Sequence, residues 1–319
     1  MAKLGHSFSF EIRPTAPYSF GLTMRKPAGW SLFTQFEVYG KDTVWTATHL
    51  HGTLAGIKLV SKGTTERPRV LARVFLKSGR THADEDAMKR ELVHCIGADE
   101  DIASFYAFAR KDSILRHTIG DLYGMHNTEA GTVFPDAVLA ILLQMTTMKR
   151  SNEMMSCLIG RYGKLAEFDG KEIRCWPAPE DIAGCGAKEL ARTCKLGYRA
   201  KHIAKLANLL AKGGFPTTEE LERMRPEKAK EMLLELPGIG DYSADIINPH
   251  GGFPIDVWSA DIFGKLFYGR EPRNGRNAIE RIKKEGLRRW GAWSWMAFFY
   301  VVQDLENLSR KMGIRLRLT

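Results

Sequence analysis

Hydrophobic and polar positions alternate along the first quarter of the chain. From Ser7 to about Gly79, short runs with this two-residue period are separated by glycine, proline and Lys-Asp breaks. Successive side chains of a strand point to opposite faces, so the pattern predicts strands that each bury one face. We therefore expect a small antiparallel sheet here, and we interpret the run Ser19–Met24 as extended like its neighbours.

After His82 the spacing becomes helical. Apolar residues recur every three or four positions from Asp84 to Cys95 and from Glu100 to Arg110, with acidic residues near each start. The same spacing predicts helices almost to the end of the chain, at Phe134–Tyr162, Ala187–Cys194, Tyr198–Lys212, Thr218–Arg223, Pro226–Leu236, Asp241–Asn248, Val257–Tyr268, Ala278–Gly286 and Ser294–Met312. Short connectors with glycine or proline separate them, so we expect a mainly α protein in which a sheet precedes a helical bundle.

The charge of the chain favours a polyanionic partner. Lys and Arg number 47 against 37 Asp and Glu, a net charge of +10, and phosphates neutralised by such a surface release counterions. A basic soluble protein without such a partner is the alternative. No apolar core of signal-peptide length opens the chain, and no apolar run approaches about 18 residues, so we expect no membrane association and an intracellular protein.

Cysteine usage argues against a disulfide framework. The chain has five cysteines, an odd number, and none of them form a CxxC pair. A framework of disulfides is therefore not expected, and a reducing compartment fits better. The cysteines are Cys95, Cys157, Cys175, Cys185 and Cys194.

The most informative segment is Leu233–Ile247, which reads LLELPGIGDYSADII. Its apolar positions predict two short helices that pack around a tight Pro-Gly-Ile-Gly turn, with Ile239 anchored in the core. Gly238 and Gly240 let the backbone take unusual dihedrals and approach a ligand, and the amides that open the second helix favour an anion. A DNA phosphate is the natural anion, while a plain helical corner with a glycine cap is the alternative.

An aspartate follows nine residues after this hairpin. Asp256 stands in the segment FPIDVWSADIF, after a loop with Pro254 and at the start of an apolar helix. Position alone favours an N-cap role for Asp256. Asp261 falls inside the same helix and is interpreted as a surface acid or as a support for its neighbours.

Together, the LxxLPGIGxxxAxxI pattern and the Pro-x-Asp segment resemble the helix-hairpin-helix DNA glycosylase superfamily. The resemblance implies a helix-hairpin-helix over residues 228–248 whose turn, Gly238, Ile239 and Gly240, binds a DNA phosphate. It also implies that Asp256 is the catalytic carboxylate. Breaking an N-glycosidic bond builds positive charge on the sugar, which a fixed carboxylate stabilises while it orients water.

Further segments resemble the branch that contains bacterial 3-methyladenine DNA glycosylase II and the eukaryotic 8-oxoguanine glycosylases. This implies an amino-terminal antiparallel α+β domain over residues 1–115, similar to half of a TATA-binding-protein fold. Two helical subdomains over residues 116–319 would clasp the damaged base. The segments are Pro17–Met24, Val44–Gly52, Ile102–Leu115, Phe134–Arg150, Lys195–Ala207 and Trp290–Val302.

The resemblance also implies contacts with DNA. Gln144 and Met145 fall where the family plugs the gap left by the everted nucleotide, and an unbranched methionine can wedge into a base stack. Tyr198 and Arg199 match a loop that contacts the opposite base in 8-oxoguanine glycosylases, and Arg150 falls near a second such contact. A core role for Met145 and a plain phosphate or surface role for Arg199 are the alternatives.

The chain departs from the family pattern at Tyr242. Bifunctional relatives carry a lysine there, which attacks the sugar as an amine and then cleaves the strand. A phenol cannot form that imine, so the resemblance implies a monofunctional enzyme in which Tyr242 is an aromatic wall for an electron-poor, alkylated purine. Phe298 is expected in the same pocket, and so is Trp258, for which core packing is the alternative.

No cofactor is expected for the hydrolysis. No cysteine follows Cys194, which excludes the iron-sulfur cluster that some superfamily members hold after the catalytic aspartate. A metal site is not expected, apart from a monovalent cation at the hairpin when DNA is bound. The resemblance implies a monomer that acts on double-stranded DNA containing a damaged base, in the cytoplasm and nucleoid, or in the nucleus of a eukaryote.

Two other functions stay open at this point. The segment Gly197–Lys201, together with Arg150, also fits an 8-oxoguanine-type glycosylase. A non-catalytic protein that uses the hairpin only as a phosphate clamp is the third possibility.

Overall fold

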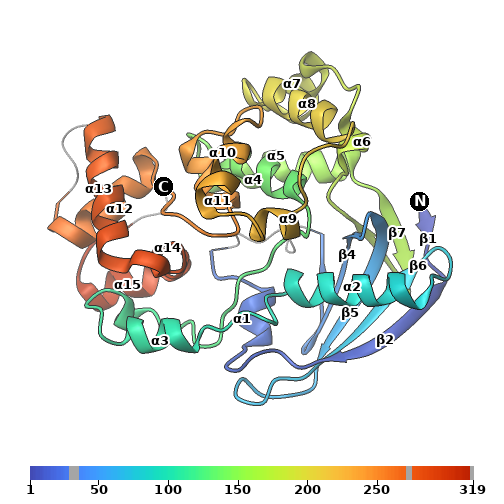
Figure 1. The fold of residues 1–319 in the computed structure, drawn as a ribbon, viewed down its shortest axis with the longest axis horizontal. Coiled ribbons are helices and arrows are strands. Elements are labelled where there is room, and N and C mark those ends of the chain that lie inside the picture. Colours follow the sequence, from blue (N-terminus) through green and yellow to red (C-terminus); the bar gives the residue numbers. More distant parts are fainter. Residues whose placement is uncertain (29–35, 271–274, 317–319) are drawn as a thin grey trace.

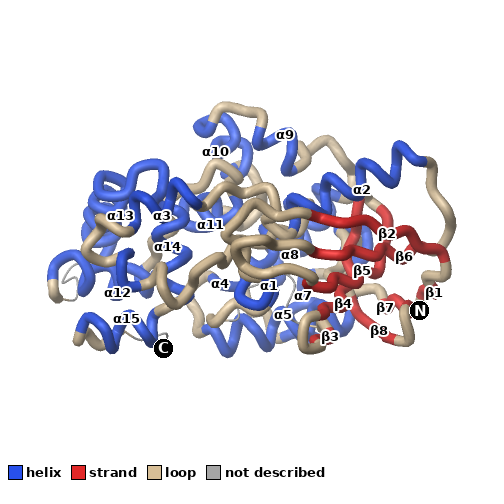
Figure 2. Tube along the Cα trace, turned by 90° about the horizontal axis from the view of Figure 1, so that it is seen from below, coloured by secondary structure: helices blue, strands red, loops and turns tan. Residues whose placement is uncertain are grey.

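The computed structural model describes residues 1–28, 36–270 and 275–316. A sheet occupies one end of the molecule and helices form the rest, as Figures 1 and 2 show. The mainly α architecture with an amino-terminal β region is thereby confirmed. Within the described part of the chain, no helix combines the length and the apolar character that a membrane span requires.

The main sheet is antiparallel and has five strands in the order β2-β6-β5-β4-β3. Helix α2 (His82–Cys95) lies across it, with Met88 and Leu92 packed on strand residues such as Ile57 and Leu59. The strands are β2 (His6–Ile12), β3 (Val38–Tyr39), β4 (Thr43–Leu50), β5 (Thr53–Ser61) and β6 (Val70–Leu76). The antiparallel sheet that the alternating pattern predicts is therefore present.

One segment of this region was interpreted wrongly. Phe20–Met24 is not extended but forms the short helix α1, because Ser19 accepts a hydrogen bond from the Leu22 amide (3.4 Å) and caps the turn. Within this helix, Thr23 and Met24 are buried. A helix of five residues is too short for its periodicity to differ from that of a strand.

A second, three-stranded sheet has the order β1-β7-β8 and was not expected. Its strands are β1 (Ala2–Lys3), β7 (Leu165–Phe168) and β8 (Lys171–Arg174). Phe168 packs on Phe75 of the main sheet and fills the space that a Cβ at Gly56 would need, 2.4 Å from the ring. A hairpin from the predicted helical region thus packs on the amino-terminal sheet.

The helices gather around two separate hydrophobic cores. The first core lies between Val133 and Ala244, and the second joins residues 102–125 to residues 253–316. The helices are α3 (Ala103–Ala109), α4 (Val133–Leu143), α5 (Met148–Tyr162), α6 (Pro179–Ile182), α7 (Ala187–Cys194), α8 (Arg199–Leu210), α9 (Thr218–Glu222), α10 (Pro226–Leu234), α11 (Asp241–Ile247), α12 (Val257–Tyr268), α13 (Gly275–Trp290), α14 (Ser294–Gln303) and α15 (Leu305–Met312), with 3-10 turns η1 (Leu115–His117) and η2 (Gly291–Trp293).

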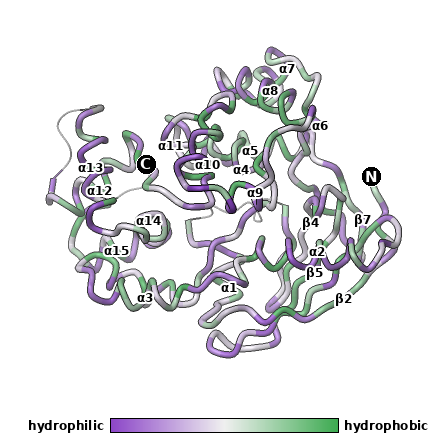
Figure 3. Tube along the Cα trace, in the orientation of Figure 1, coloured by the Kyte–Doolittle hydropathy of each residue, from purple (hydrophilic) through white to green (hydrophobic). Residues whose placement is uncertain are grey.

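Helix α4 is the central element of the first core. Its trace is strongly hydrophobic in Figure 3, and most of its residues are buried. A helix that is apolar on nearly all sides must be surrounded, and α5, α8 and α11 pack against it. The hairpin with the glycine turn, which includes α11, is therefore built directly on the core.

Two long helices of the sequence prediction are each divided in the structure. The expected helix Phe134–Tyr162 is interrupted between α4 and α5, where Met145 has a positive φ of 45° and Thr147 caps α5 through the Arg150 amide. The expected helix Ser294–Met312 is interrupted at Asp304. Continuous apolar spacing conceals such breaks, because the residues on both sides still face a core.

The cysteines correct one further expectation. Cys157 on α5 and Cys194 at the end of α7 form a disulfide, with their Cα atoms 5.4 Å apart. An odd number of cysteines does not exclude a single disulfide. The spacing of these two could not predict one, because they lie on helices that only the tertiary fold brings together. Of the remaining cysteines, Cys95 and Cys175 are buried and Cys185 is half-buried.

Candidate active site

Asp256 is held rigidly at the start of α12. Its Oδ1 accepts hydrogen bonds from the amides of Trp258 (3.1 Å) and Ser259 (2.7 Å) and from the Ser259 hydroxyl (2.8 Å). The Asp256 amide in turn donates to Ser259 Oγ (2.8 Å), which completes a reciprocal cap. All the described hydrogen bonds of the carboxylate fall on Oδ1, so Asp256 is both an N-cap and a carboxylate of fixed orientation.

Tyr242 lies close to this carboxylate. It stands in the first turn of α11, and both its burial and the negative charge of Asp256 raise the pKa of the phenol well above its ordinary value. The phenol is therefore neutral over the physiological range. The hairpin helix α11 and the start of α12 thus bring an aromatic ring and a carboxylate together.

A cavity of about 390 Å³ opens beside Tyr242, a size typical of small-molecule sites. One part of its wall is aromatic, and another part carries titratable groups from four different segments. The aromatic part is Tyr242, Trp293, Trp295, Phe298 and Phe299, and the titratable part includes His94, Asp99, Glu100, Glu129, Asp136, Glu222 and His250. Desolvation and the neighbouring Glu129 raise the pKa of Asp136 well above its ordinary value.

The predicted pocket residues are only partly brought together. Tyr242 and Phe298 line the cavity, and Phe298 is held from behind by a stack on Phe263. Trp258 does not line it. Its side chain packs against the second helical core, so the pocket role expected for Trp258 is corrected in favour of core packing. Asp256 does not line the cavity. It lies beside two residues that do, Pro254 in the same loop and Tyr242 on α11.

The unusual backbone dihedrals expected at both glycines of the turn are found at Gly238 only, since Gly240 is extended. Gly238 has a φ of +85°, and a Cβ there would lie 2.6 Å from the Cβ of His202. Gly240 has open space where its Cβ would be, and Ile239 is buried with 6% exposure. A side chain is therefore unfavourable at position 238, whereas Gly240 leaves the backbone accessible at the start of α11.

A network of charges fastens the hairpin to the second helical core. Lys230 on α10 lies 2.6 Å from a carboxylate oxygen of both Asp241 and Asp245. Lys283 on α13 lies 2.6 Å from Asp245, which is buried, and also pairs with Asp241. Because α13 packs on α12, the network fixes the position of the glycine turn relative to Asp256.

Gln144 and Met145 were both expected to fill the gap left by an everted nucleotide, but their side chains lie in different surroundings. The side-chain amide of Gln144 donates to the Gly238 carbonyl (2.8 Å) and to Ser243 Oγ (3.0 Å), which ties it to the hairpin. Met145, by contrast, is 70% exposed. A core role for Met145 is therefore wrong, and this methionine is the side chain that projects beside the glycine turn.

Arg199 requires a correction. It was expected to offer its guanidinium to DNA, but the side chain is buried and donates to the carbonyls of Ile141 (3.2 Å) and Gln144. The last carbonyls of a helix lack intrahelical donors, and Arg199 supplies them for α4. Tyr198 remains 52% exposed, and Arg150 pairs with Glu153 (3.0 Å) and the Lys195 carbonyl (2.5 Å).

Sequence reasoning missed the titratable wall of the cavity. His94, Glu129 and Glu222 come from α2, from the segment before α4 and from α9, and no local motif joins them. Among the described residues, these three also form the one group whose ligand atoms lie close enough together for a metal ion. Trp293 and Trp295 lay within the closing segment of the resemblance but were not singled out.

Comparison with known proteins finds relatives of the chain by sequence. No protein-family model matches it. A probable N-glycosylase/DNA lyase of Methanothermobacter thermautotrophicus is 25% identical over 257 residues, which cover 73% of this chain and 78% of the relative. A DNA-3-methyladenine glycosylase of Bacillus subtilis is 23% identical over 208 residues, 64% of this chain and 67% of the relative.

Solved structures share the fold over nearly the whole chain. The 3-methyladenine DNA glycosylase of Archaeoglobus fulgidus aligns with a TM-score of 0.73 and 20% identity, covering 96% of this chain and 100% of that one. The ligand-free 8-oxoguanine glycosylase/lyase of Clostridium acetobutylicum aligns with a TM-score of 0.67 and 16% identity, covering 92% and 95%. The chain is thus similar in sequence to proteins named as an N-glycosylase/DNA lyase and a DNA-3-methyladenine glycosylase, and it shares the fold of solved 3-methyladenine and 8-oxoguanine glycosylases.

Proposed function

We propose that the protein is a monofunctional DNA glycosylase that hydrolyses alkylated purines out of double-stranded DNA and leaves an abasic site. One observation carries the proposal: a rigidly capped Asp256 lies beside an aromatic-walled cavity, close enough to Tyr242 for its charge to raise the pKa of that phenol. This is the arrangement that an everted nucleotide needs.

The chemistry follows from the carboxylate. As the bond between C1′ and the base nitrogen breaks, the electron pair leaves with the base and positive charge develops on the sugar. Asp256 stabilises that charge electrostatically and accepts a hydrogen bond from the attacking water, whose oxygen adds to C1′. The water gives up its proton to the carboxylate and then to solvent. No metal or redox cofactor is required by these steps.

The cavity favours an electron-poor base. An alkylated purine that carries positive charge stacks well on the rings of Tyr242 and Phe298. Such a base also leaves as a neutral molecule, which lowers the demand for a general acid.

We assign DNA binding to the hairpin and to the loop between α4 and α5. The amides of the Gly238–Gly240 turn would hold a phosphate, with a monovalent cation nearby when DNA is bound, and the exposed Met145 would fill the gap in the base stack. Tyr198 and Arg150 remain the proposed contacts to the opposite strand. We further propose that the protein is a monomer located with the DNA, in the cytoplasm and nucleoid or in the nucleus of a eukaryote.

A screen of base release tests the proposal. The purified protein is incubated with duplexes carrying methylated purines, 8-oxoguanine, uracil or hypoxanthine, and free bases are identified by mass spectrometry. We expect release of methylated purines and a strand that breaks only after alkali. Binding to all duplexes with no base released from any of them would favour a phosphate clamp without catalysis.

An 8-oxoguanine-type enzyme is the second candidate. It is favoured by the relative named as an N-glycosylase/DNA lyase and by the fold shared with an 8-oxoguanine glycosylase/lyase. Borohydride trapping separates the two, because only an amine nucleophile forms a reducible imine. We expect no covalent adduct, since Tyr242 stands where bifunctional relatives carry lysine. An adduct on 8-oxoguanine duplexes would replace the first proposal by the second.

A further inference from the structure

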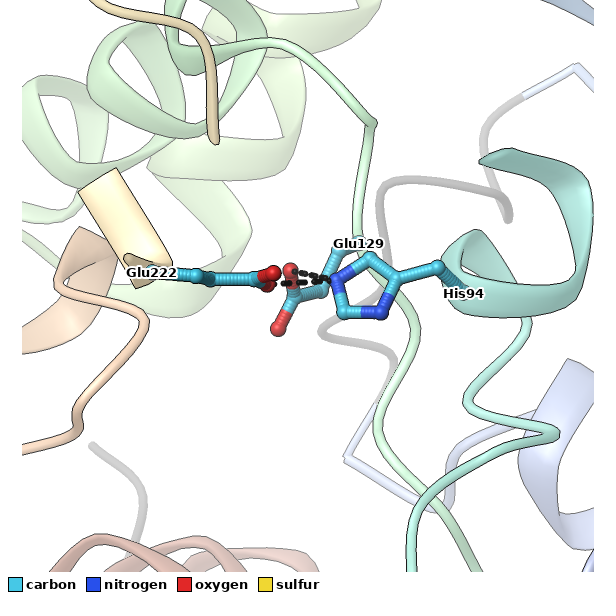
Figure 4. Close-up of side chains that lie close together, drawn as sticks. All are labelled: His94, Glu129 and Glu222. Atoms are coloured by element: carbon cyan, nitrogen blue, oxygen red, sulfur yellow. Dashed lines mark ion pairs between the residues drawn. The ribbon is translucent and has the colours of Figure 1, made fainter. Parts of the chain in front are cut away.

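His94, Glu129 and Glu222 converge on one point of the cavity wall. Figure 4 shows the imidazole directed at both carboxylates, each from a different segment of the chain. His94 Nε2 lies 2.8 Å from Glu222 Oε1 and 3.4 Å from Glu129 Oε2. One ligand atom from each residue can be chosen so that all three lie within 4.8 Å of one another.

The imidazole is oriented as a metal-binding histidine usually is. Its Nδ1 lies 3.4 Å from Asp99 Oδ2, so that this carboxylate can hold the Nδ1 proton. Its Nε2 is buried and has no hydrogen-bond partner of acceptable geometry among the described residues, although Glu222 approaches it closely. A carboxylate on Nδ1 is the usual support of a histidine ligand, and it leaves Nε2, the nitrogen that faces the two glutamates, as the ligand atom.

The side chains around His94 carry more negative than positive charge. Three carboxylates, Asp99, Glu129 and Glu222, surround the single imidazole. In the described chain, neither glutamate has an ion-pair partner from Lys or Arg, although the protein as a whole carries a charge of +10.

We propose that His94, Glu129 and Glu222 form a binding site for a divalent transition-metal ion such as Zn²⁺ or Mn²⁺. One imidazole nitrogen and two carboxylate oxygens are ligands that these ions accept, and three protein ligands leave a position open toward the cavity. The ion would join α2 of the amino-terminal domain to α9 of the first helical core. The inference does not depend on the reaction proposed above.

Metal titration of the full chain tests the site. Untagged protein is dialysed against a chelator and titrated with Zn²⁺ and with Mn²⁺ by calorimetry, with the melting temperature followed in parallel. We expect one ion per chain and a rise in melting temperature, because an ion that binds only the folded state stabilises it. His94→Gln and Glu222→Gln should each weaken binding at least about tenfold.

Matched variants control for a general loss of charge or of histidine. His6→Gln on β2 and Glu227→Gln on α10 change exposed side chains and should leave binding unchanged. If His94→Gln or Glu222→Gln fails to fold, wild-type crystals grown with Zn²⁺ supply the answer, and an anomalous peak between the three side chains supports the proposal. A peak elsewhere, no binding, or equal binding by the folded variants would overturn it.

Discussion

At the scale of single residues, Asp256 caps α12, and the proposed function gives the same carboxylate a second, catalytic task. Oδ1 takes the three described hydrogen bonds that cap α12, and these bonds prevent the group from rotating. A charge that is already oriented needs no reorganisation when the sugar becomes positive, which is the main source of electrostatic catalysis. The capping role therefore supports the proposed catalytic role.

We predict that Asp256→Asn separates the two tasks. Asparagine caps a helix about as well as aspartate, so the melting temperature should hardly change. The negative charge is lost, and single-turnover base release should fall at least about 100-fold while duplex binding is kept. Asp261→Asn, five residues on in the same helix, serves as the control and should retain full release. Unaltered release in Asp256→Asn would remove this group from the mechanism.

Arg199 is predicted to act through structure rather than through DNA contact. Arg199→Met leaves the carbonyls of Ile141 and Gln144 without their donor, and unpaired buried acceptors cost about 1–3 kcal/mol of unfolding free energy. Chemical denaturation measures this loss. Arg150→Met, which alters a partly exposed residue, should cost less than about 1 kcal/mol. Equal stabilities of the two variants would argue against the assigned role.

At the scale of elements, the hairpin is bonded both to the loop after α4 and to α13. Gln144 binds the turn from the loop after α4, and Lys283 binds the start of α11 from α13. Met145 therefore projects from a loop that is anchored to the same turn that is proposed to hold a phosphate. The spacing between the two proposed DNA contacts is set by these bonds rather than by the loop itself.

The two glycines of the turn are predicted to differ. Gly238→Ala forces a side chain into a left-handed backbone and against His202, so it should destabilise the protein by about 1–3 kcal/mol. Gly240→Ala meets open space and should fold normally, yet it should weaken duplex binding because its methyl group stands where a phosphate would approach. Thermal melting and fluorescence anisotropy measure the two effects. Normal binding by a well-folded Gly240→Ala variant would contradict the assigned phosphate site.

At the scale of the whole molecule, the cavity exists only where three parts of the fold meet. The amino-terminal domain contributes His94, the first helical core contributes Tyr242 and the second contributes Phe298. Stability and site geometry are therefore linked, because any change that separates these parts opens the cavity. The segment of residues 102–125 supports this arrangement by packing among the carboxy-terminal helices.

The junction between α14 and α15 predicts a pH dependence of stability. Burial, together with the charge of Asp121, raises the pKa of Asp304 to about 7 from its ordinary 3.8. The folded state then binds more protons than the unfolded state between these values. The contribution of Asp304 is thus fully present below about pH 4 and is lost as the pH rises through 7.

Asp304→Asn should remove this dependence. Between pH 4 and 8, the unfolding free energy of wild type should fall relative to the variant by at most about 4 kcal/mol, because a tenfold change in proton affinity corresponds to about 1.4 kcal/mol. Urea denaturation at several pH values measures the difference. A constant difference between the two proteins would show that Asp304 titrates normally.

The sequence by itself determined the features that depend on local pattern. The antiparallel sheet, the helical body, the glycine turn and the place of Asp256 at a helix start all follow from spacing and from residue chemistry within short segments. Tyr242 and Phe298 were expected in the pocket and line the cavity. The family resemblance supplied the pairing of hairpin and carboxylate, which no single element predicts.

Only the tertiary structure decided which side chains face the cavity, the solvent or a partner helix. The burial of Arg199, the core packing of Trp258, the Cys157–Cys194 bond and the hairpin β7–β8 all depend on residues far apart in the chain. The spacing of apolar residues predicts which positions are buried, but it does not predict which residues they pack against. Long-range packing makes that choice, because each buried polar group must find its partner wherever the fold supplies one.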